Sequence, residues 1–192
     1  MSRSLNLSNS ELIEKSVANN ESELTHTGAL LALTGNRTGR SPKDRYIVQE
    51  SSTKDKIDWG EVNRPFDSNH FDKLWNKVSA YLDDKDHYVS NVHVGSNKDH
   101  YIPVEVKSEL AWHSLFSKLI FISPSDFNEE NKEVWKIITA ANYVCDPDED
   151  HTNSESCVII NFLRRKLLIA GIKYAGEIKK SIFAVQNILH PE

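Results

Sequence analysis

Apolar residues recur along this chain at two spacings, one typical of helices and the other typical of strands. The segment 8–19 opens with Ser-Asn-Ser-Glu and places its apolar residues on one face, so we predict a helix there. The apolar positions of 66–82 fall at helical spacing and predict a longer amphipathic helix. Two further helices are predicted on the same grounds over 109–118 and 179–189.

Extended segments are predicted between these helices. Six segments have the alternation or the short apolar runs of strands: 30–33, 46–48, 88–94, 101–106, 158–162 and 167–171. The first of them is predicted to be a buried strand that runs into a glycine-containing loop, and the last two to form a hairpin around Arg164-Arg165-Lys166. Because helices and strands do not alternate strictly, we predict an α/β fold with a mixed sheet.

The composition is that of an ordinary globular domain. The 192 residues suit one domain with a sizeable core, and 39% of them are apolar and 27% charged. A net charge of -5 argues against a nucleic-acid partner, and no apolar stretch approaches the roughly 18 residues that span a bilayer. The N-terminus lacks the apolar core of a secretory signal, and Cys145 and Cys157 are too few for a disulfide framework. We therefore predict a cytoplasmic protein with free thiols.

The segment 34–45, Thr-Gly-Asn-Arg-Thr-Gly-Arg-Ser-Pro-Lys-Asp-Arg, imitates a phosphate-binding loop. Its glycines, Gly35 and Gly39, enclose one residue fewer than those of a P-loop, and Arg40 stands where the P-loop has its lysine. The backbone N–H groups would then point elsewhere, so we exclude an ATP site here. Glycines allow a close approach of the backbone, and a guanidinium fork suits a carboxylate or a phosphate. The alternative is that Arg40 only pairs with Asp44 on the surface.

A second segment, 174–183, places two adjacent lysines after a Tyr-Ala-Gly turn and before an apolar run. Neighbouring ammonium groups are costly to hold together. At least one of Lys179 and Lys180 is therefore predicted to face a carboxylate, a phosphate or a metal-bound oxyanion. Taken alone, the same residues also fit a solvated face at the start of a helix.

Three other groups of residues are not predicted to be sites. The acidic run 146–150 begins like a calcium loop, but His151 and Cys157 stand where the loop requires its glycine and its bidentate glutamate. Trp112 and His113 are predicted to pack in the core or behind a site. Three nearby histidines lack the spacing of a zinc site: His87, His93 and His100.

The glycine segment and the lysine segment together resemble the ATP-dependent phosphoenolpyruvate carboxykinases, and further motifs follow in that family's order and at about its spacing. These are Trp59-Gly60-Glu61-Val62-Asn63, Ala111-Trp112-His113-Ser114-Leu115-Phe116, Asp146-Pro147 leading to Ser154-Glu155, and Ile160-Asn161-Phe162. The resemblance covers almost the whole chain. It implies that residues 1–192 are the substrate-side N-terminal domain of the family, with a mixed α/β sheet, and that the P-loop-containing domain would begin beyond Glu192.

The resemblance also implies roles for individual residues. Arg40 would contact the substrate carboxylate, and Tyr174 the carboxylate or carbon dioxide end of the substrate. Lys180 would bind the substrate and the catalytic Mn2+ or Mg2+, which requires the neutral amine. Lys179 would stabilise the enolate oxygen or nearby phosphate charge. The implied reaction decarboxylates oxaloacetate and phosphorylates it with ATP to phosphoenolpyruvate, a carboxy-lyase step of gluconeogenesis.

A few positions depart from the family's pattern. His151 replaces a turn glycine, so the backbone there must accept an unusual angle or the loop must change shape. Ile172 replaces a threonine and its hydroxyl. These changes affect turns and packing, and they spare Arg40, Tyr174 and both lysines.

Two classes of function remain open. The chain is either part of a carboxykinase whose kinase-like remainder is a separate chain or was lost, or a non-catalytic domain that binds a dicarboxylate or a partner protein. No G-x-x-x-x-G-K-[ST] segment is present, so the 192 residues alone are predicted to be inactive and not to bind ATP. An exposed apolar patch where a second domain would dock favours the first class, and a polar surface there favours the second.

Overall fold

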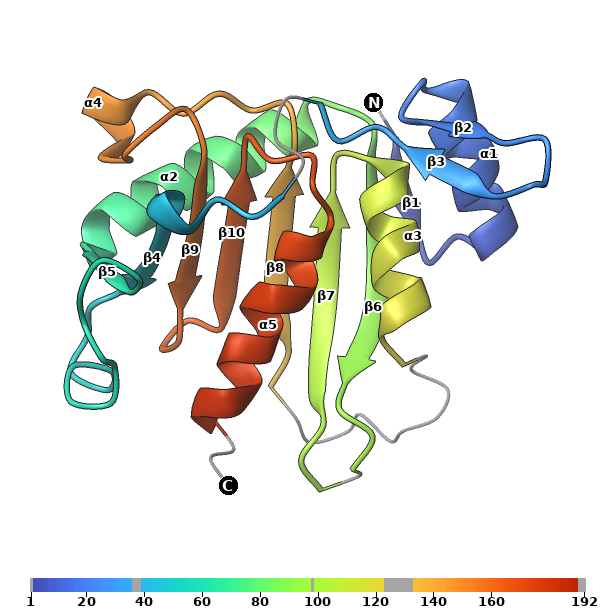
Figure 1. The fold of residues 1–192 in the computed structure, drawn as a ribbon. Coiled ribbons are helices and arrows are strands. Elements are labelled where there is room, and N and C mark those ends of the chain that lie inside the picture. The colour runs from blue at the N-terminus through green and yellow to red at the C-terminus, as the bar shows by residue number, and fades with distance from the viewer. Residues whose placement is uncertain (1, 36–38, 98, 123–132, 190–192) are drawn as a thin grey trace.

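A computed structural model describes residues 2–35, 39–97, 99–122 and 133–189. This part of the chain is built around one eight-stranded sheet with the order β1-β6-β7-β8-β10-β9-β4-β5 (Figure 1). The strands are β1 Arg3–Leu5, β4 Arg45–Val48, β5 Arg64–Phe66, β6 His87–Val94, β7 Ile102–Ser108, β8 Trp135–Ala140, β9 Cys157–Asn161 and β10 Lys166–Ala170. The pairs β6–β7 and β9–β10 are antiparallel and the other neighbours are parallel. The predicted mixed α/β sheet is confirmed.

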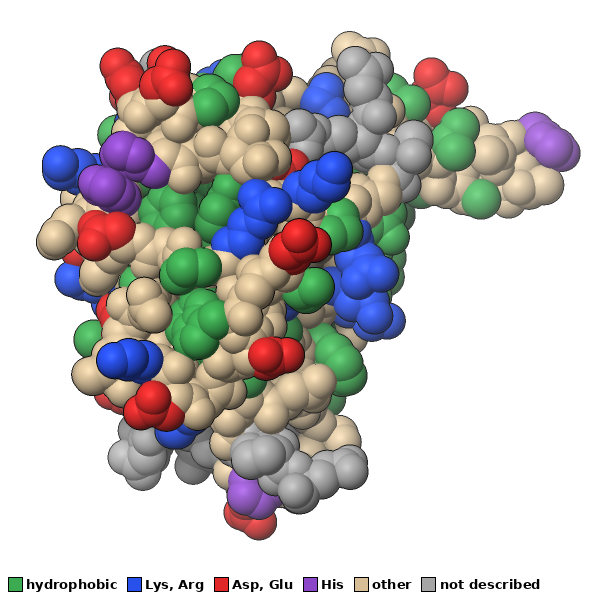
Figure 2. All heavy atoms as spheres, turned by 60° about the vertical axis from the view of Figure 1, so that its left-hand side comes forward, with side chains coloured by type: hydrophobic (Ala, Val, Ile, Leu, Met, Phe, Trp, Pro, Cys, Tyr) green, Lys and Arg blue, Asp and Glu red, His purple; other side chains and the backbone are tan. Residues whose placement is uncertain are grey.

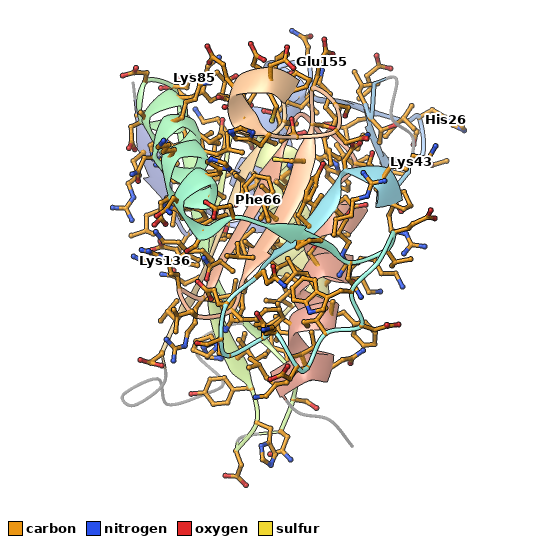
Figure 3. All side chains as sticks on the ribbon, turned by 90° about the vertical axis from the view of Figure 1, so that its left-hand side faces the viewer. His26, Lys43, Phe66, Lys85, Lys136 and Glu155 are labelled. Carbon is orange, nitrogen blue, oxygen red and sulfur yellow. The ribbon has the colours of Figure 1, made fainter. Side chains whose placement is uncertain are left out.

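Helices cover both faces of this sheet. They are α1 Asn9–Ala18, α2 Ser68–Asp83, α3 Ala111–Ile120, α4 Pro147–Asp150 and α5 Gly176–Leu189, with a 3-10 turn, η1, at Pro42–Asp44. Figure 3 shows the sheet from its side, with α2 on one face and α5 on the other. The labelled Lys85 lies on the α2 side and the labelled Lys43 on the α5 side. A small separate sheet pairs β2, Ser22–Leu24, with β3, Leu30–Ala32.

Successive residues of the central strands enter two different cores. In β9, Ile160 packs in the cluster beneath α5, whereas Ile159 packs in the cluster beneath α2. Leu167 and Leu168 of β10 divide in the same way. Because both faces are buried, these strands read in the sequence as continuous apolar runs. Full burial of each such side chain stabilises the fold by about 1.5–3 kcal/mol, so this two-sided core fixes the place of α5 on the sheet.

The predicted helices are confirmed, with changes at their ends. Ser8 caps α1 and forms a capping box with Glu11, whose carboxylate accepts the backbone N–H of Ser8 at 2.8 Å. Asp67 caps α2 by accepting two backbone N–H groups of the first turn. The last helix, α5, begins at Gly176 rather than at 179, because the glycine of the Tyr-Ala-Gly sequence already belongs to the first turn.

The prediction that segment 30–33 is a buried strand is wrong about burial. Segment 30–33 does form β3, but Leu31 and Leu33 are 54% and 43% exposed, because β3 pairs with β2 in the small sheet. The sequence pattern also does not predict β8, which lies between β7 and β10 in the middle of the main sheet. The remaining strand predictions are confirmed as β4, β6, β7 and the β9–β10 hairpin.

Two turns use the left-handed backbone region. Gly171 follows β10 at φ 71°, and a Cβ there would lie 2.7 Å from the carbonyl oxygen of Glu155, so this turn requires glycine. His151 follows α4 at φ 57°, so the histidine accepts the unusual angle that the sequence raised as one of two outcomes. Its ring stacks on that of His70, with centroids 3.7 Å apart.

Cys145 and Cys157 are buried free thiols whose sulfur atoms lie 3.8 Å apart. Contact with Cys145, together with burial, raises the pKa of the Cys157 thiol. A raised pKa leaves little thiolate at Cys157, which makes this thiol unreactive. Within the described ranges, no helix is long and apolar enough to cross a membrane.

Candidate functional site

The two segments predicted to carry function meet at the start of α5. Residues 39–44, which lead into β4, lie on the side of the sheet that carries α5 (Figure 1). A Cβ built on Gly35 would lie 3.4 Å from the side-chain Cδ of Lys173. The backbone N–H of Ser41 donates a hydrogen bond to the carboxylate of Glu177, in the first turn of α5. Residues 36–38 of the loop lie outside the described ranges. The fold thus joins two motifs that are far apart in the sequence.

Glu177 is the link between the two motifs. The residue is 4% exposed, and burial raises the pKa of its carboxyl group, while the Ser41 N–H and the positive charges of Arg45 and Arg40 act in the opposite direction. Burial lowers the pKa of Arg45, and the charge of Glu177 partly offsets this. The N-terminus of α5 and the nearby guanidinium groups offset part of the cost of burying this carboxylate. This arrangement holds the chain at Arg40 against α5.

Arg40 is exposed next to this buried carboxylate. The sequence left open that Arg40 pairs with Asp44 on the surface. Asp44 is only 5% exposed, and its carboxylate accepts the hydroxyl groups of Ser154 at 2.8 Å and Ser156 at 3.3 Å. Asp44 is therefore buried against the chain that leads into β9. The alternative pairing of Arg40 with Asp44 stays a prediction. Arg40 lies where an anion from solvent can reach it.

Tyr174 packs half-buried against the core beneath α5. A Cβ on Gly176 would lie 2.5 Å from the ring carbon Cε1 of Tyr174 and 2.7 Å from its phenol oxygen. A glycine at position 176 leaves room for this position of the Tyr174 ring. The packing of the ring therefore explains the glycine of the Tyr-Ala-Gly sequence. The carbonyl oxygen of Tyr174 accepts the backbone N–H of Glu177 at 3.3 Å. Glu177 therefore contacts both the turn of Tyr174 and the loop of Arg40.

Comparison with known proteins gives matches over nearly the whole chain. A family model described as Phosphoenolpyruvate carboxykinase matches residues 2–192. The chain belongs to the phosphoenolpyruvate carboxykinase family. Among curated relatives, Phosphoenolpyruvate carboxykinase (ATP) of Geobacillus kaustophilus is 49% identical over 188 residues. The enzyme of the same name from Bacillus pumilus is 46% identical over 189 residues, and that from Bacillus subtilis is 45% identical over 189 residues.

Each of these alignments covers 97% of this chain and 36% of the relative. The chain therefore spans about a third of the length of the carboxykinases that it matches. The family membership predicted from the motifs is confirmed, and the mixed sheet is the fold that was predicted with it.

The two lysines of the carboxykinase motif diverge on the surface of α5. Both are exposed, and adjacent positions of a helix point about 100° apart. The Nζ of Lys180 lies 5.9 Å from the ring centroid of Phe183, whereas Lys179 lines a groove with Ile182 and Phe183. Their positions agree with the solvated helix face that the sequence also allowed. Roles for Lys179 and Lys180 in binding and catalysis therefore stay predictions.

The family resemblance implies a divalent metal, which needs several ligands from side chains or substrate. Among the residues that the structure describes, no three histidine, cysteine, aspartate or glutamate side chains gather as a metal site. Lys180 could supply one nitrogen ligand, and only as the neutral amine. The described part of the chain therefore does not fit a metal site by itself.

An apolar groove borders Lys179. It encloses about 210 Å³ and is lined by His93, Val94, Gly95, Ser96, Ile120, Phe121, Ile122, Lys179, Ile182, Phe183 and Gln186. Phe183 is 52% exposed at its edge, and Leu163 and Leu189 are 62% and 44% exposed. The side of the molecule drawn in Figure 2 also exposes apolar side chains among acidic and basic ones. Apolar surface thus extends from the groove along α5.

Motif spacing does not predict Glu177 and Arg45 as site residues. An acidic residue in the first turn of a helix is usually explained by the helix dipole, so Glu177 gives no separate signal. Arg45 ends the glycine segment 34–45 and, in the structure, is the first residue of β4. The available signal was a charge of opposite sign in each motif, which favours a contact between them.

Proposed function

We propose that this chain forms the oxaloacetate-binding side of an ATP-dependent phosphoenolpyruvate carboxykinase. The observation that carries the proposal is the contact between Ser41 and Glu177, which holds Arg40 and Tyr174 in one corner of the domain. The name of the relatives, Phosphoenolpyruvate carboxykinase (ATP), supports the reaction class. The nucleotide and the remaining ligands would come from residues equivalent to the rest of those relatives.

In this proposal Arg40 and Tyr174 bind the substrate. The guanidinium group of Arg40 donates two parallel hydrogen bonds to one carboxylate of oxaloacetate. The hydroxyl of Tyr174 donates to the carboxylate that leaves as carbon dioxide. Two donors from separate segments fix the orientation of a small dianion, which brings the bond to be broken into a defined place.

The lysines act on the charge that the reaction develops. When the C–C bond breaks, its electron pair passes into the carbonyl group and produces the enolate of pyruvate. A cationic Lys179 would stabilise that oxyanion where it forms, which is usually the largest catalytic contribution. The enolate oxygen then attacks the terminal phosphorus of ATP in line, and the bond to the bridging oxygen breaks so that ADP leaves. A bound divalent metal would neutralise phosphate charge, and we propose Lys180 as its one ligand from this chain.

The exposed apolar surface favours an enzyme part over a free-standing binding domain. Phe183 and the groove beside Lys179 lie on the same helix as the lysines. Apolar side chains exposed around a groove are typical of a surface that another domain or protein covers. A second domain that contributes the nucleotide would cover it, whereas a domain that only binds a dicarboxylate has no need of it.

Complementation tests this proposal. The 192-residue chain is mixed with the remaining two thirds of the Geobacillus kaustophilus relative, expressed separately, and phosphoenolpyruvate formation from oxaloacetate and ATP is measured with Mn2+. We expect activity from the mixture and none from either part alone. A stable complex without activity would contradict the enzymatic role and favour the dicarboxylate-binding alternative.

A further inference from the structure

His113 lies beneath the turn that carries Tyr174. It projects from α3 and is 1% exposed. Its Nε2 lies 2.9 Å from the carbonyl oxygen of Lys173, and its Nδ1 lies 2.9 Å from the hydroxyl oxygen of Thr139. Both ring nitrogens are therefore paired, one with the residue before Tyr174 and one with the central strand β8.

The partners determine where the imidazole carries its proton. A carbonyl oxygen can only accept, so Nε2 must hold the hydrogen that it donates to Lys173. Nδ1 is then the acceptor of the Thr139 hydroxyl. Complete burial lowers the pKa of His113 to about 4, so the ring is neutral around neutral pH. A neutral ring with one fixed tautomer makes both bonds at once.

The groups that hold His113 are themselves firmly placed. Thr139 is fully buried in β8, between two parallel neighbours in the middle of the sheet. The hydroxyl of Ser117 donates to the carbonyl oxygen of His113 at 2.9 Å within α3. The imidazole therefore links α3 and β8 to the backbone at Lys173 and fixes their relative positions.

The rest of the turn is fixed at both ends. Gly171 donates its N–H to the carbonyl oxygen of Ala140 at 2.9 Å, and Tyr174 accepts the N–H of Glu177 at 3.3 Å. Between these two points, the His113 bond is a side-chain contact to the backbone of Lys173. The plane of the peptide between Lys173 and Tyr174 thus follows from the orientation of the imidazole.

We propose that His113 is a positioning residue for substrate binding: its Nε2–H holds the Lys173 carbonyl so that Tyr174 presents its hydroxyl group to the substrate carboxylate. The inference rests on the proposed function, because it takes Tyr174 as a substrate contact. His113 is buried and does not touch the substrate, so it is not a catalytic acid or base.

Three variants of the 192-residue chain separate positioning from stability. His113→Phe removes both ring bonds, and His113→Gln keeps a donor near the place of Nε2. Val78→Ala is the matched control, because Val78 is fully buried in α2 on the opposite face of the sheet. The readouts are hydrogen exchange of the Glu177 amide without ligand, the affinity for oxaloacetate by calorimetry, and the imidazole tautomer by 15N NMR.

We expect the Nε2–H tautomer in the unmodified chain. His113→Phe should speed exchange of the Glu177 amide and weaken oxaloacetate binding, each about tenfold more than Val78→Ala at equal loss of global stability. His113→Gln should recover part of both effects, and it replaces His113→Phe if that variant does not fold.

Two results would overturn the inference: an Nδ1–H tautomer, or equal effects of the His113 variants and Val78→Ala. If the unmodified chain binds no oxaloacetate, the proposed function and the substrate part of this inference both fail. The exchange rate of the Glu177 amide still decides whether His113 holds the turn.

Discussion

The backbone N–H of Ser41 donates to the buried carboxylate of Glu177, and this bond ties the glycine loop to the helix that carries both lysines. Ser41 directly follows Arg40, so the place of the guanidinium depends on the place of α5. The two motifs with the predicted substrate contacts are therefore structurally coupled. A substitution in one motif should change the position of residues in the other.

Arg40→Ala should weaken oxaloacetate binding. The substrate carboxylate would lose a charged hydrogen-bonded partner, which typically costs about 1.5–3 kcal/mol, or about 10- to 150-fold in affinity. Isothermal titration of the 192-residue chain or of the complemented enzyme measures the change. Lys43→Ala is the control, because Lys43 is an exposed cation in the adjacent turn η1. An unchanged affinity in Arg40→Ala, or an equal loss in both variants, contradicts the substrate assignment.

Lys180→Met should abolish the activity of the complemented enzyme, whereas Tyr174→Phe should reduce it more mildly, by about 10- to 150-fold. The first change removes the proposed metal ligand, and the second removes one hydrogen bond to a carboxylate, worth about 1.5–3 kcal/mol. Turnover and Mn2+ binding by electron paramagnetic resonance are measured together. Lys136→Met is the control, because Lys136 is exposed on the α2 side (Figure 3). Small and equal effects on turnover and Mn2+ affinity would rule out the metal role of Lys180.

The 192-residue chain alone should not bind ATP. Its glycine loop has one residue fewer than a P-loop, and the described residues offer no complete metal site. Isothermal titration with ATP and Mg2+ or Mn2+ should give no binding heat. Micromolar affinity would show that the nucleotide site has been misplaced.

Gly171→Ala should destabilise the domain, whereas Gly39→Ala should not. At Gly171 a Cβ would lie 2.7 Å from a backbone oxygen with φ at 71°, which costs about 1–3 kcal/mol. At Gly39 a Cβ meets nothing within 4 Å, and the reduced freedom of the unfolded chain should leave stability unchanged or raise it by up to about 1 kcal/mol. Urea unfolding compares the two, and equal stability of both variants would contradict the described turn.

Stability should fall between pH 6.5 and pH 4 because of His113. Burial lowers the pKa of His113 from 6.5 to about 4, so the unfolded chain binds the proton more readily in this window. The contribution is complete above pH 6.5 and decreases as the pH falls, by up to about 3 kcal/mol. Urea unfolding of the unmodified chain and His113→Gln measures it. The variant should show a flatter profile over this range, and parallel profiles would contradict a neutral buried His113.

Sequence patterns predicted the helices and strands that depend on residues close together in the chain. The capping box of Ser8 and Glu11 and the apolar face of α2 each depend on residues within a few helical turns. Both helices could therefore be predicted from the sequence. Segment 30–33 shows the limit of such patterns. An apolar run indicates a strand but not its partner, and β3 pairs in the small exposed sheet. The strand β8 has Lys136 within its apolar run and is recognisable only from its two neighbours.

The candidate site could be predicted only in part. Arg40, Tyr174 and the lysines were predicted because they stand in motifs that resemble a family. Glu177 contacts Ser41 and His113 contacts Lys173, both far away in the sequence, and no periodicity encodes such contacts. These partners could be identified only from the fold.

The half of the sheet next to the glycine loop pairs an early strand with a strand that comes more than 100 residues later in the chain. The strand β4, near the N-terminus, takes its inner place only when β9 and β10 have joined it. Such distant pairings form slowly, because the entropy of closing a long loop is lost before the contacts are gained. Only then can α5 cover the apolar face beneath it. The part of the domain that contains Arg40 and Tyr174 should therefore be the last to become ordered, and a partly synthesised chain should be prone to aggregate.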